Sequence, residues 1–386
     1  MDETKLNELI GTAVTEMSIA ESAPLIYLGD KLGLYRAMAG AGPLTSQDLA
    51  GRTGTHERYV REWLNNQAAG GIVEYHPADG TYELSDESAH LWADQTSPVF
   101  LGGQLEVIAS MWADADRLAE AFRSGAGVAW GDHDHRLYPG VQRFYGGLYR
   151  GSLVQEWIPA LDGVEAKLRA GARVADVGCG YGISTVILAE AFPRSTFVGY
   201  DAHPESIAAA EKAAAEAGVA ERVRFEVADA TSFGGTGFDL ICFFDAIHDM
   251  GDPVGAATHT RAALAEDGTV MLVEPAAGDR VEDNLNPVGR TYYAGSTFLC
   301  TPSALAQPGG HSLGAQAGPE RLGAVLAEAG FSHRRTAVTT PFTLVLEARP
   351  GPPPPTPRRP PRWRPPSARC SACGPTRTTR CTSPAG

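Results

Sequence analysis

The chain has 386 residues, 43% of them hydrophobic, and a formal net charge of −14 at pH 7. This length suggests two domains with ample core, and the acidic charge argues against non-specific binding to nucleic acid or anionic membranes. The start MDETKLNELI lacks the basic-then-apolar order of a secretory signal, and no apolar run approaches the ~20 residues that span a bilayer. We therefore expect a cytoplasmic protein in which Cys179, Cys242 and Cys300 stay reduced.

Residues 1–90 predict a small helical domain that ends in a β-hairpin. Apolar residues recur at helical spacing from Leu6 to Met38, which indicates one or two helices. A short helix with Thr45 and Asp48 at capping-box spacing follows, and HERYVREWLNNQAAGG predicts another. Two short strands then flank the turn in IVEYHPADGTYELSD. Helix, turn, helix and β-hairpin together predict a winged-helix domain.

Winged helices often bind DNA through their second helix, which enters the major groove. Here that helix offers Arg58 and Arg61 but also Glu57 and Glu62, and it lacks the basic stripe of a groove-reading helix. The sequence therefore argues against a nucleic-acid partner. A transcriptional regulator that senses a metabolite stays as the alternative function.

Residues 91–168 predict a helical connector that is rich in aromatic rings. It contains Trp112, Phe122, Trp130, Tyr138, Phe144, Tyr145, Tyr149 and Trp157. Such a stretch can roof an active site, with Tyr145 among the substrate-binding residues, or can pack as core between two domains. The run His133-Asp134-His135 has no further ligand at metal spacing, which predicts a solvated turn and no metal site.

From residue 174 onward, strands and helices alternate, which predicts an α/β domain with a parallel doubly wound sheet. Strands are expected at 174–177, 196–200, 223–227, 240–244 and 269–273, and helices at 183–192, 204–217 and 320–329. Residues 334–339 and 343–348 predict a closing antiparallel pair because their link is short.

The run VADVGCGYG predicts a cofactor turn after the first of these strands. Its glycines Gly178, Gly180 and Gly182 form G-x-G-x-G, whereas a dinucleotide site has G-x-G-x-x-G and places the pyrophosphate at the helix N-terminus. Asp176 adds a carboxylate where such a cofactor has its phosphates. A free amino group suits that position, and S-adenosylmethionine has an amine and no phosphate.

Two further strand ends carry acids that suit a nucleoside. The separation of Asp176 from Asp201 leaves room for one helix and one strand, so Asp201 is expected to face the ribose, with Ala202 beside the adenine edge. Asp229, followed by Ala230, ends the next strand and suits the adenine amine.

These motifs resemble those of the class I S-adenosylmethionine-dependent methyltransferases. The match runs through VADVGCGYG, FVGYDAH, VADATSF and FDLICFFDAIHD, over residues 174–347. It narrows to small-molecule enzymes of actinobacterial type that carry an N-terminal winged-helix domain. The resemblance implies a Rossmann-like seven-stranded sheet with its last strand antiparallel, S-adenosyl-L-methionine as cofactor, Phe244 and Asp245 beside its methionine end, and an N-terminal domain that forms a homodimer or a lid.

His248, in FFDAIHDMGDP, is the candidate catalytic residue. It follows the fourth strand, and an unperturbed imidazole, which titrates near ~6.5, is largely neutral at pH 7 and can accept a hydroxyl proton. The segment resembles the I-H-D of O-methyltransferases, whose histidine is the base, but Met250 stands where an aromatic residue usually follows. Base and wall residue both stay open. Asp249 either orients the imidazole or caps the helix that starts near Pro253.

The long connection EPAAGDRVEDNLNPVGRTYYAGSTFLCTPSAL predicts an acceptor pocket, because long ordered loops are often functional. Asn286, Arg290 and Tyr293 are its candidate substrate-binding residues, and Asn284 and Tyr292 add polar and aromatic groups for a planar or polyketide-like acceptor. The predicted reaction is O-methylation of a secondary metabolite. C- or N-methylation, or non-methylating chemistry on the same fold, stays as an alternative.

The sequence therefore divides the chain into four segments. Residues 1–90 form the dimerisation or lid domain, 91–168 the connector, and 169–350 the cofactor domain. Residues 351–386 hold proline runs that no strand or helix tolerates, which predicts a disordered tail.

Overall fold

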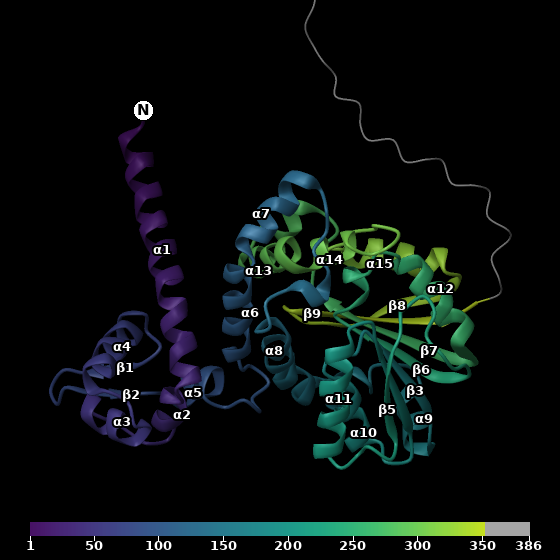
Figure 1. The fold of residues 1–386 in the computed structure, drawn as a ribbon, viewed down its shortest axis with the longest axis horizontal. Coiled ribbons are helices and arrows are strands. Elements are labelled where there is room, and N and C mark those ends of the chain that lie inside the picture. The colour runs from purple at the N-terminus through teal and green to yellow at the C-terminus, as the bar shows by residue number, and fades with distance from the viewer. Residues whose placement is uncertain (352–386) are drawn as a thin grey trace, which may run out of the picture. The chain divides into compact units, whose positions relative to one another are not determined.

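The structure, a computed structural model, describes residues 1–351 (Figure 1). Within this range the chain forms a two-stranded sheet and a seven-stranded sheet, connected by helices. The prediction of a disordered tail concerns residues that lie outside this range from 352 onward.

The N-terminal elements confirm the predicted winged-helix domain. They are α1 (Glu3–Lys31), α2 (Leu34–Met38), α3 (Ser46–Thr53), α4 (Glu57–Ala69), the hairpin strands β1 (Glu74–His76) and β2 (Thr81–Glu83), and α5 (Asp86–Trp92). Thr45 and Asp48 form the expected capping box at the start of α3. Tyr35, Leu49 and Trp63 belong to a separate hydrophobic core in this domain.

The arginines of α4 form ion pairs with glutamates one turn away. Arg61 lies 2.7 Å from Glu57, and Arg58 lies 2.5 Å from Glu62. These pairs alternate the two charges along the helix, unlike the basic stripe of a groove-reading helix.

The connector is helical, as expected. It consists of α6 (Gly102–Ala113), α7 (Ala115–Ser124), the turn η1 (Trp130–Asp132), α8 (Leu137–Ser152), the π-helical turn η2 (Leu153–Trp157) and α9 (Val164–Ala170). The prediction of a solvated turn at His133 is wrong. That ring is buried, because the Asp114 carboxylate between α6 and α7 pairs with its Nδ1, which lies 3.1 Å from Oδ2.

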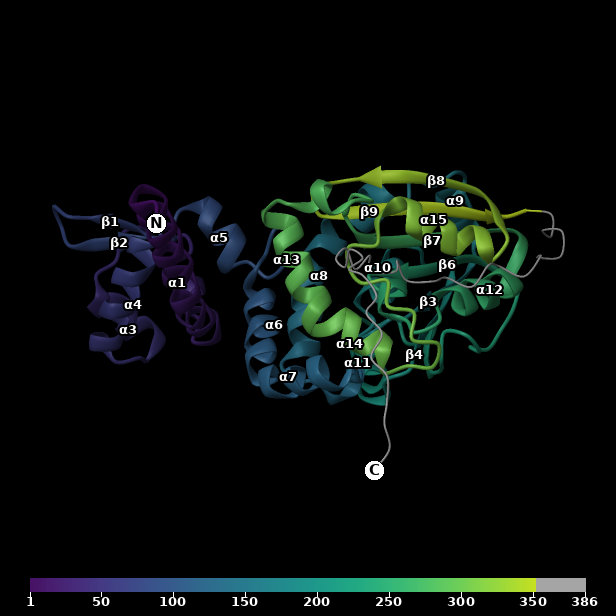
Figure 2. The same ribbon diagram turned by 90° about the horizontal axis from the view of Figure 1, so that it is seen from above.

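The seven-stranded sheet has the order β5-β4-β3-β6-β7-β9-β8. Its strands are β3 (Arg173–Val177), β4 (Thr196–Asp201), β5 (Val223–Val227), β6 (Phe238–Phe244), β7 (Leu264–Pro275), β8 (Phe331–Thr339) and β9 (Thr343–Pro350). Strand β9 runs antiparallel to both its neighbours, β7 and β8, at one side of the sheet (Figure 2). This confirms the predicted sheet with an antiparallel last strand.

Alternate side chains of the central strands enter two cores, one on each face. Val174, Leu240 and Met271 pack with α10 (Ile183–Ala191), α11 (Pro204–Glu216) and the connector. Their neighbours in sequence pack with α12 (Pro253–Ala263) and α15 (Gly318–Glu328). Because both faces are covered, the inner parallel strands β3, β4 and β6 are mostly buried, and the parallel strands bring their carboxyl ends to one edge.

The long connection after β7 folds into short helices. It contains η4 (Val281–Asn284), α13 (Pro287–Gly295), the π-helical turn η5 (Ser296–Cys300) and α14 (Thr301–Leu305). Among the helices of residues 1–351, none combines the length and apolar character needed to cross a bilayer.

Candidate active site

A cavity of about 610 Å³ opens at the carboxyl ends of the parallel strands. This lies within the ~300–1,000 Å³ that is usual for small-molecule sites. Its walls come from the strand ends of β3, β4 and β6, from α8 in the connector, and from the insertion after β7. Ten of the predicted site residues line it: Tyr145, Gly178, Gly180, Asp201, Ala202, Asp229, Ala230, Phe244, Asp245 and His248.

The glycine turn after β3 uses a backbone conformation that favours glycine. Gly178, Gly180 and Gly182 have φ of 75°, 51° and 75°. The N–H of Gly180 donates to Oδ2 of Asp201 at 2.8 Å, which ties the turn to the end of β4. Gly182 does not line the cavity; a Cβ there would lie 2.7 Å from the Phe225 ring, so this glycine lets α10 pack closely on the sheet.

Asp201 and Asp229 present carboxylates at neighbouring strand ends. Oδ1 of Asp201 accepts from the N–H of His203 at 2.9 Å, and burial raises the pKa of this carboxyl. Oδ1 of Asp229 accepts from the N–H and the hydroxyl of Thr231 at 2.8 and 2.5 Å. Each acid therefore has one oxygen fixed by its own loop, which orients it on the cavity wall.

Asp176 is not on the cavity wall, contrary to its predicted contact with the cofactor amine. Its side chain is 1% exposed, and Oδ2 accepts from the hydroxyls of Ser184 and Thr185 at 2.6 Å each. Burial raises the pKa of this carboxyl to about 6, against the opposing effect of the two hydroxyls. Neighbouring side chains of a strand point to opposite faces, so Val177 borders the cavity and Asp176 does not.

Asp245, the first residue after β6, has an unusual backbone. Its φ of 50° is the only positive φ of a non-glycine residue in the described chain, and such left-handed residues concentrate at functional sites. The hydroxyl of Tyr149 donates to its Oδ2 at 2.7 Å. Burial, together with the negative charge of Glu274, raises the pKa of Asp245 to about 7.

His248 lies at the cavity with its ring held by a second buried acid. The turn η3 (Ile247–Asp249) carries it, and its Nδ1 contacts Oε2 of Glu274, which is 1% exposed at the end of β7. The other oxygen of Glu274 accepts from the N–H of Ile247 at 3.2 Å. Sequence reasoning missed Glu274, although a glutamate that ends the apolar run VMLVEP was a usable signal.

The electrostatic setting of His248 differs from the unperturbed imidazole expected from the sequence. Burial opposes the charged form, but the carboxylates of Glu274 and Asp249 outweigh it and raise the pKa of His248 well above 6.5. The ring is therefore a stronger base than a free imidazole while the cavity contains no cation.

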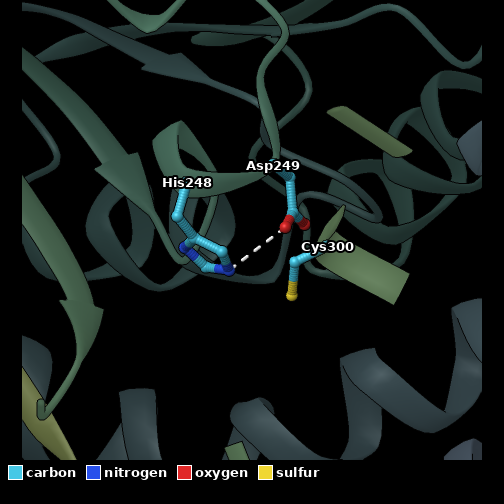
Figure 3. Close-up of side chains that lie close together, drawn as sticks. All are labelled: His248, Asp249 and Cys300. Carbon is cyan, nitrogen blue, oxygen red and sulfur yellow. Dashed lines mark ion pairs between the residues drawn. The ribbon is translucent and has the colours of Figure 1, made fainter. Parts of the chain in front are cut away.

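Asp249 does not cap the helix after it, so that prediction is wrong. Asp252 is the cap of α12, and its Oδ1 accepts from the N–H of Gly255 at 2.7 Å. The adjacent Pro253 at the first helical position explains this choice. Asp249 instead places Oδ1 3.2 Å from Nε2 of His248, and Cys300 lies beside both (Figure 3).

The aromatic residues of the connector divide between roof and core. Trp130, Tyr138, Phe144, Tyr145 and Tyr149 line the cavity. By contrast, Trp157 is fully buried in the core, and Trp112 and Phe122 are 76% and 73% exposed.

The three polar residues predicted for the insertion do not reach the cavity. Asn286 caps α13 by accepting from the N–H of Gly289 at 2.9 Å, and the exposed Arg290 pairs with Glu16 at 2.8 Å. Tyr293 is half-buried outside the cavity, because it points along a different face of α13 than its neighbour. The neighbour, Tyr292, does line the cavity.

The cavity wall is acidic. Asp201, Asp229, Asp245, Asp249 and Asp252 line it against two histidines, His203 and His248, and no lysine or arginine of the described residues does. Such a wall attracts cations and repels ligands with net negative charge.

Comparisons with known proteins agree with this geometry. Residues 168–330 match the family described as "Methyltransferase domain", and residues 20–93 match the "Rv2258c-like winged HTH domain". No curated protein matches the sequence.

Several solved structures share the fold at low sequence identity. The mitomycin 7-O-methyltransferase MmcR is 19% identical with a TM-score of 0.66, covering 90% of this chain and 100% of its own. The complex of human N-acetylserotonin methyltransferase with S-adenosylmethionine (SAM) is 16% identical with a TM-score of 0.66, covering 91% and 99%. The pyocyanin biosynthetic protein PhzM is 21% identical with a TM-score of 0.62, covering 90% and 100%.

Proposed function

The chain belongs to the methyltransferases that carry an N-terminal winged-helix domain, and on this premise we propose that it transfers a methyl group from S-adenosylmethionine to a hydroxyl of a small aromatic metabolite. One observation carries the proposal. The strand-end acids that suit the cofactor and the buried His248–Glu274 pair border the same cavity. Among the solved relatives, one is bound to SAM and one to S-adenosylhomocysteine (SAH), which supports the cofactor.

The cofactor has a matching set of groups along the strand ends. Asp201 suits the ribose hydroxyls, and Asp229 the adenine amine, with Ala202 and Ala230 leaving space for the ring. Asp245, charged above its pKa of about 7, suits the positive charges of the methionine end. Asp176 supports this site indirectly, because its carboxylate holds the hydroxyls of Ser184 and Thr185 at the start of α10.

Methyl transfer from a sulfonium is an in-line displacement, so the protein must mainly position the acceptor oxygen and take its proton. The oxygen–carbon bond forms as the carbon–sulfur bond breaks, and the hydroxyl proton passes to Nε2 of His248. Glu274 keeps the other proton on Nδ1 and stabilises the imidazolium. The positive cofactor favours prior loss of the proton from Nε2, since like charges repel.

The acceptor is proposed to be planar and without negative charge. Aromatic rings of α8 and Tyr292 line the cavity, and among the described residues its wall has five aspartates against two histidines. A phenol should therefore be methylated far better than the same phenol bearing a carboxylate. Comparison of phenol and hydroxybenzoate pairs tests this, because equal kcat/KM values would contradict it.

The enzymatic proposal is tested by two measurements on the full chain. Calorimetry should detect binding of SAM and SAH but not of NAD. Mass analysis of a polyphenol panel should then show a gain of one methyl group, with turnover lowered on the order of 10²-fold or more in His248→Ala. Binding of NAD alone would remove the cofactor assignment, and an unchanged rate would make His248 a wall residue.

We further propose that two copies pair through α1. Leu6, Ile10, Val14 and Met17 recur every three or four residues and are 37%, 51%, 61% and 61% exposed. An apolar stripe of this kind is stable in water when a second helix covers it. Light scattering should give a dimer for the native chain and a monomer for Val14→Glu with Met17→Glu, whereas Thr12→Glu on the opposite face should stay dimeric.

A further inference from the structure

We propose that His248, Asp249 and Cys300 form a binding site for a thiophilic divalent transition metal such as Zn²⁺. One ligand atom from each residue lies within 4.8 Å of the others: an imidazole nitrogen, a carboxylate oxygen and the thiol sulfur (Figure 3). The sequence predicted no metal site, because Cys300 enters from the insertion after β7, far along the chain from the other two.

The spacing is close to what a tetrahedral ion requires. Zn²⁺ takes nitrogen and oxygen at ~2.0–2.2 Å and thiolate sulfur at ~2.3 Å, which puts ligand atoms ~3.3–3.8 Å apart. Nε2 of His248 and Oδ1 of Asp249 already lie 3.2 Å apart. The Cys300 sulfur lies within 4.8 Å of both atoms, so an inward movement of its side chain would complete three ligands.

Two of the three side chains are short of other partners. Oδ1 of Asp249 is buried, and within the described chain its only ion-pair partner is Nε2 of His248 at 3.2 Å. Cys300 is a free thiol that is 8% exposed. A bound ion would give this buried carboxylate oxygen a stronger partner than the contact with the imidazole.

The surrounding contacts fix these ligands in the manner of metal sites. Glu274 contacts Nδ1 of His248, so Nε2 faces the centre, as in the carboxylate–histidine–zinc arrangement. Gln307 holds the backbone of the Asp249 turn, because its Nε2 donates to the Asp249 carbonyl at 2.8 Å and its Oε1 accepts from the Gly251 N–H at 3.0 Å.

The ligand set also indicates which metals would bind. Nitrogen, oxygen and sulfur donors suit Zn²⁺ and Co²⁺, whereas Mg²⁺ and Ca²⁺ prefer oxygen alone. All three residues line the cavity, so a fourth position stays open to water or to an oxygen of the acceptor. Binding releases the proton of the Cys300 thiol and any proton on Nε2, which go to the solvent.

A metal at this place would occupy the nitrogen that accepts the acceptor proton in the proposed function. If that function holds, Zn²⁺ should inhibit methyl transfer, competitively with the acceptor and reversibly by a chelator. The metal site itself does not depend on the proposed function, since binding is measured without cofactor or acceptor.

The test uses the full chain after removal of metal with a chelator. Titration with Co²⁺ should give one equivalent bound and a thiolate-to-cobalt charge-transfer band, and competition with a chromophoric chelator should give the Zn²⁺ affinity. Cys300→Ser should abolish the band and weaken Zn²⁺ at least tenfold, and Asp249→Asn should weaken Zn²⁺ while keeping the band. Mg²⁺ should not displace Co²⁺.

The cysteines near the C-terminus provide the matched control. Cys370, Cys373 and Cys381 could bind the metal themselves, so the triple serine variant should keep the band and the affinity of the native chain. The site is refuted if that variant loses the band, or if Cys300→Ser and Asp249→Asn both bind Zn²⁺ as tightly as the native chain. Circular dichroism of each variant separates loss of ligand from loss of fold.

Discussion

Nδ1 of His248 contacts Oε2 of Glu274, a carboxylate that is 1% exposed at the end of β7. A charge so deeply buried is costly unless it is paired. Here it is paired with the ring that faces the cavity, and its second oxygen holds the N–H of Ile247 in the same turn. Glu274 therefore sets both the tautomer and the direction of the imidazole.

Replacement of Glu274 by Gln should lower kcat on the order of 10²-fold or more, because the amide no longer stabilises the imidazolium. Cofactor affinity, measured by calorimetry, should change little. The same substitution in a His248→Ala background should have almost no further effect on kcat, since the two residues act as one unit. Equal, additive losses in both backgrounds would contradict this coupling.

Binding of SAM should release protons at pH 7. Asp245, with a pKa of about 7, is about half protonated in the free protein at pH 7, and the pKa of His248 is raised well above 6.5. A cation in the cavity lowers both pKa values. Calorimetry at pH 7 in buffers of different ionisation enthalpy should show net proton release.

The share of Asp245 in this release can be separated by substitution. Asp245→Asn should reduce the number of protons released and flatten the fall in cofactor affinity below pH 7. Tyr149→Phe should move that fall to higher pH, because the Tyr149 hydroxyl lowers the pKa of Asp245. Identical proton counts for the native chain and Asp245→Asn would show that Asp245 is not near the bound charge.

A comparison of Gly182 with Gly163 separates the effect of close packing on stability from the effect of backbone strain. Both are N-caps in the left-handed region, with φ of 75° and 72°. A Cβ on Gly182 would lie 2.7 Å from Phe225 and 2.8 Å from Ala210, whereas one on Gly163 meets nothing within 4 Å.

Alanine at Gly163 should cost ~1–2 kcal/mol of unfolding free energy from the strained backbone alone. At Gly182 the cost should be larger by ~1–3 kcal/mol, since the methyl also overpacks the interface of α10 with the sheet. Urea unfolding of the two variants measures both values. Equal losses would mean that the sheet relaxes around the added methyl.

The parts of the site that follow from local patterns could be predicted from the sequence. Strand ends of a parallel sheet meet at one edge, so the spacing of Gly178, Asp201 and Asp229 is enough to place them together. Tyr292 and Cys300 could not be placed, because they depend on how the insertion folds back over the sheet. Which face of α13 turns inward is decided by packing and not by local sequence.

Asp176 provides a stability prediction with a definite sign. Its pKa rises from 3.8 to about 6 on folding, so the folded chain favours the neutral acid. The stability from this group is fully present below the unfolded pKa and is lost as the pH rises through about 6. At about 1.4 kcal/mol per pKa unit, the loss is on the order of 3 kcal/mol between pH 4 and pH 7.

Asp176→Asn should remove this dependence, because the amide stays neutral and its oxygen can still accept from Ser184 and Thr185. Urea unfolding at pH 4.5 and pH 7.5 measures the difference between the variant and the native chain. Other carboxyl groups titrate in both proteins and cancel in this difference. The variant should therefore gain stability relative to the native chain at the higher pH, and a difference that stays constant across the two pH values would show that Asp176 is charged within the fold.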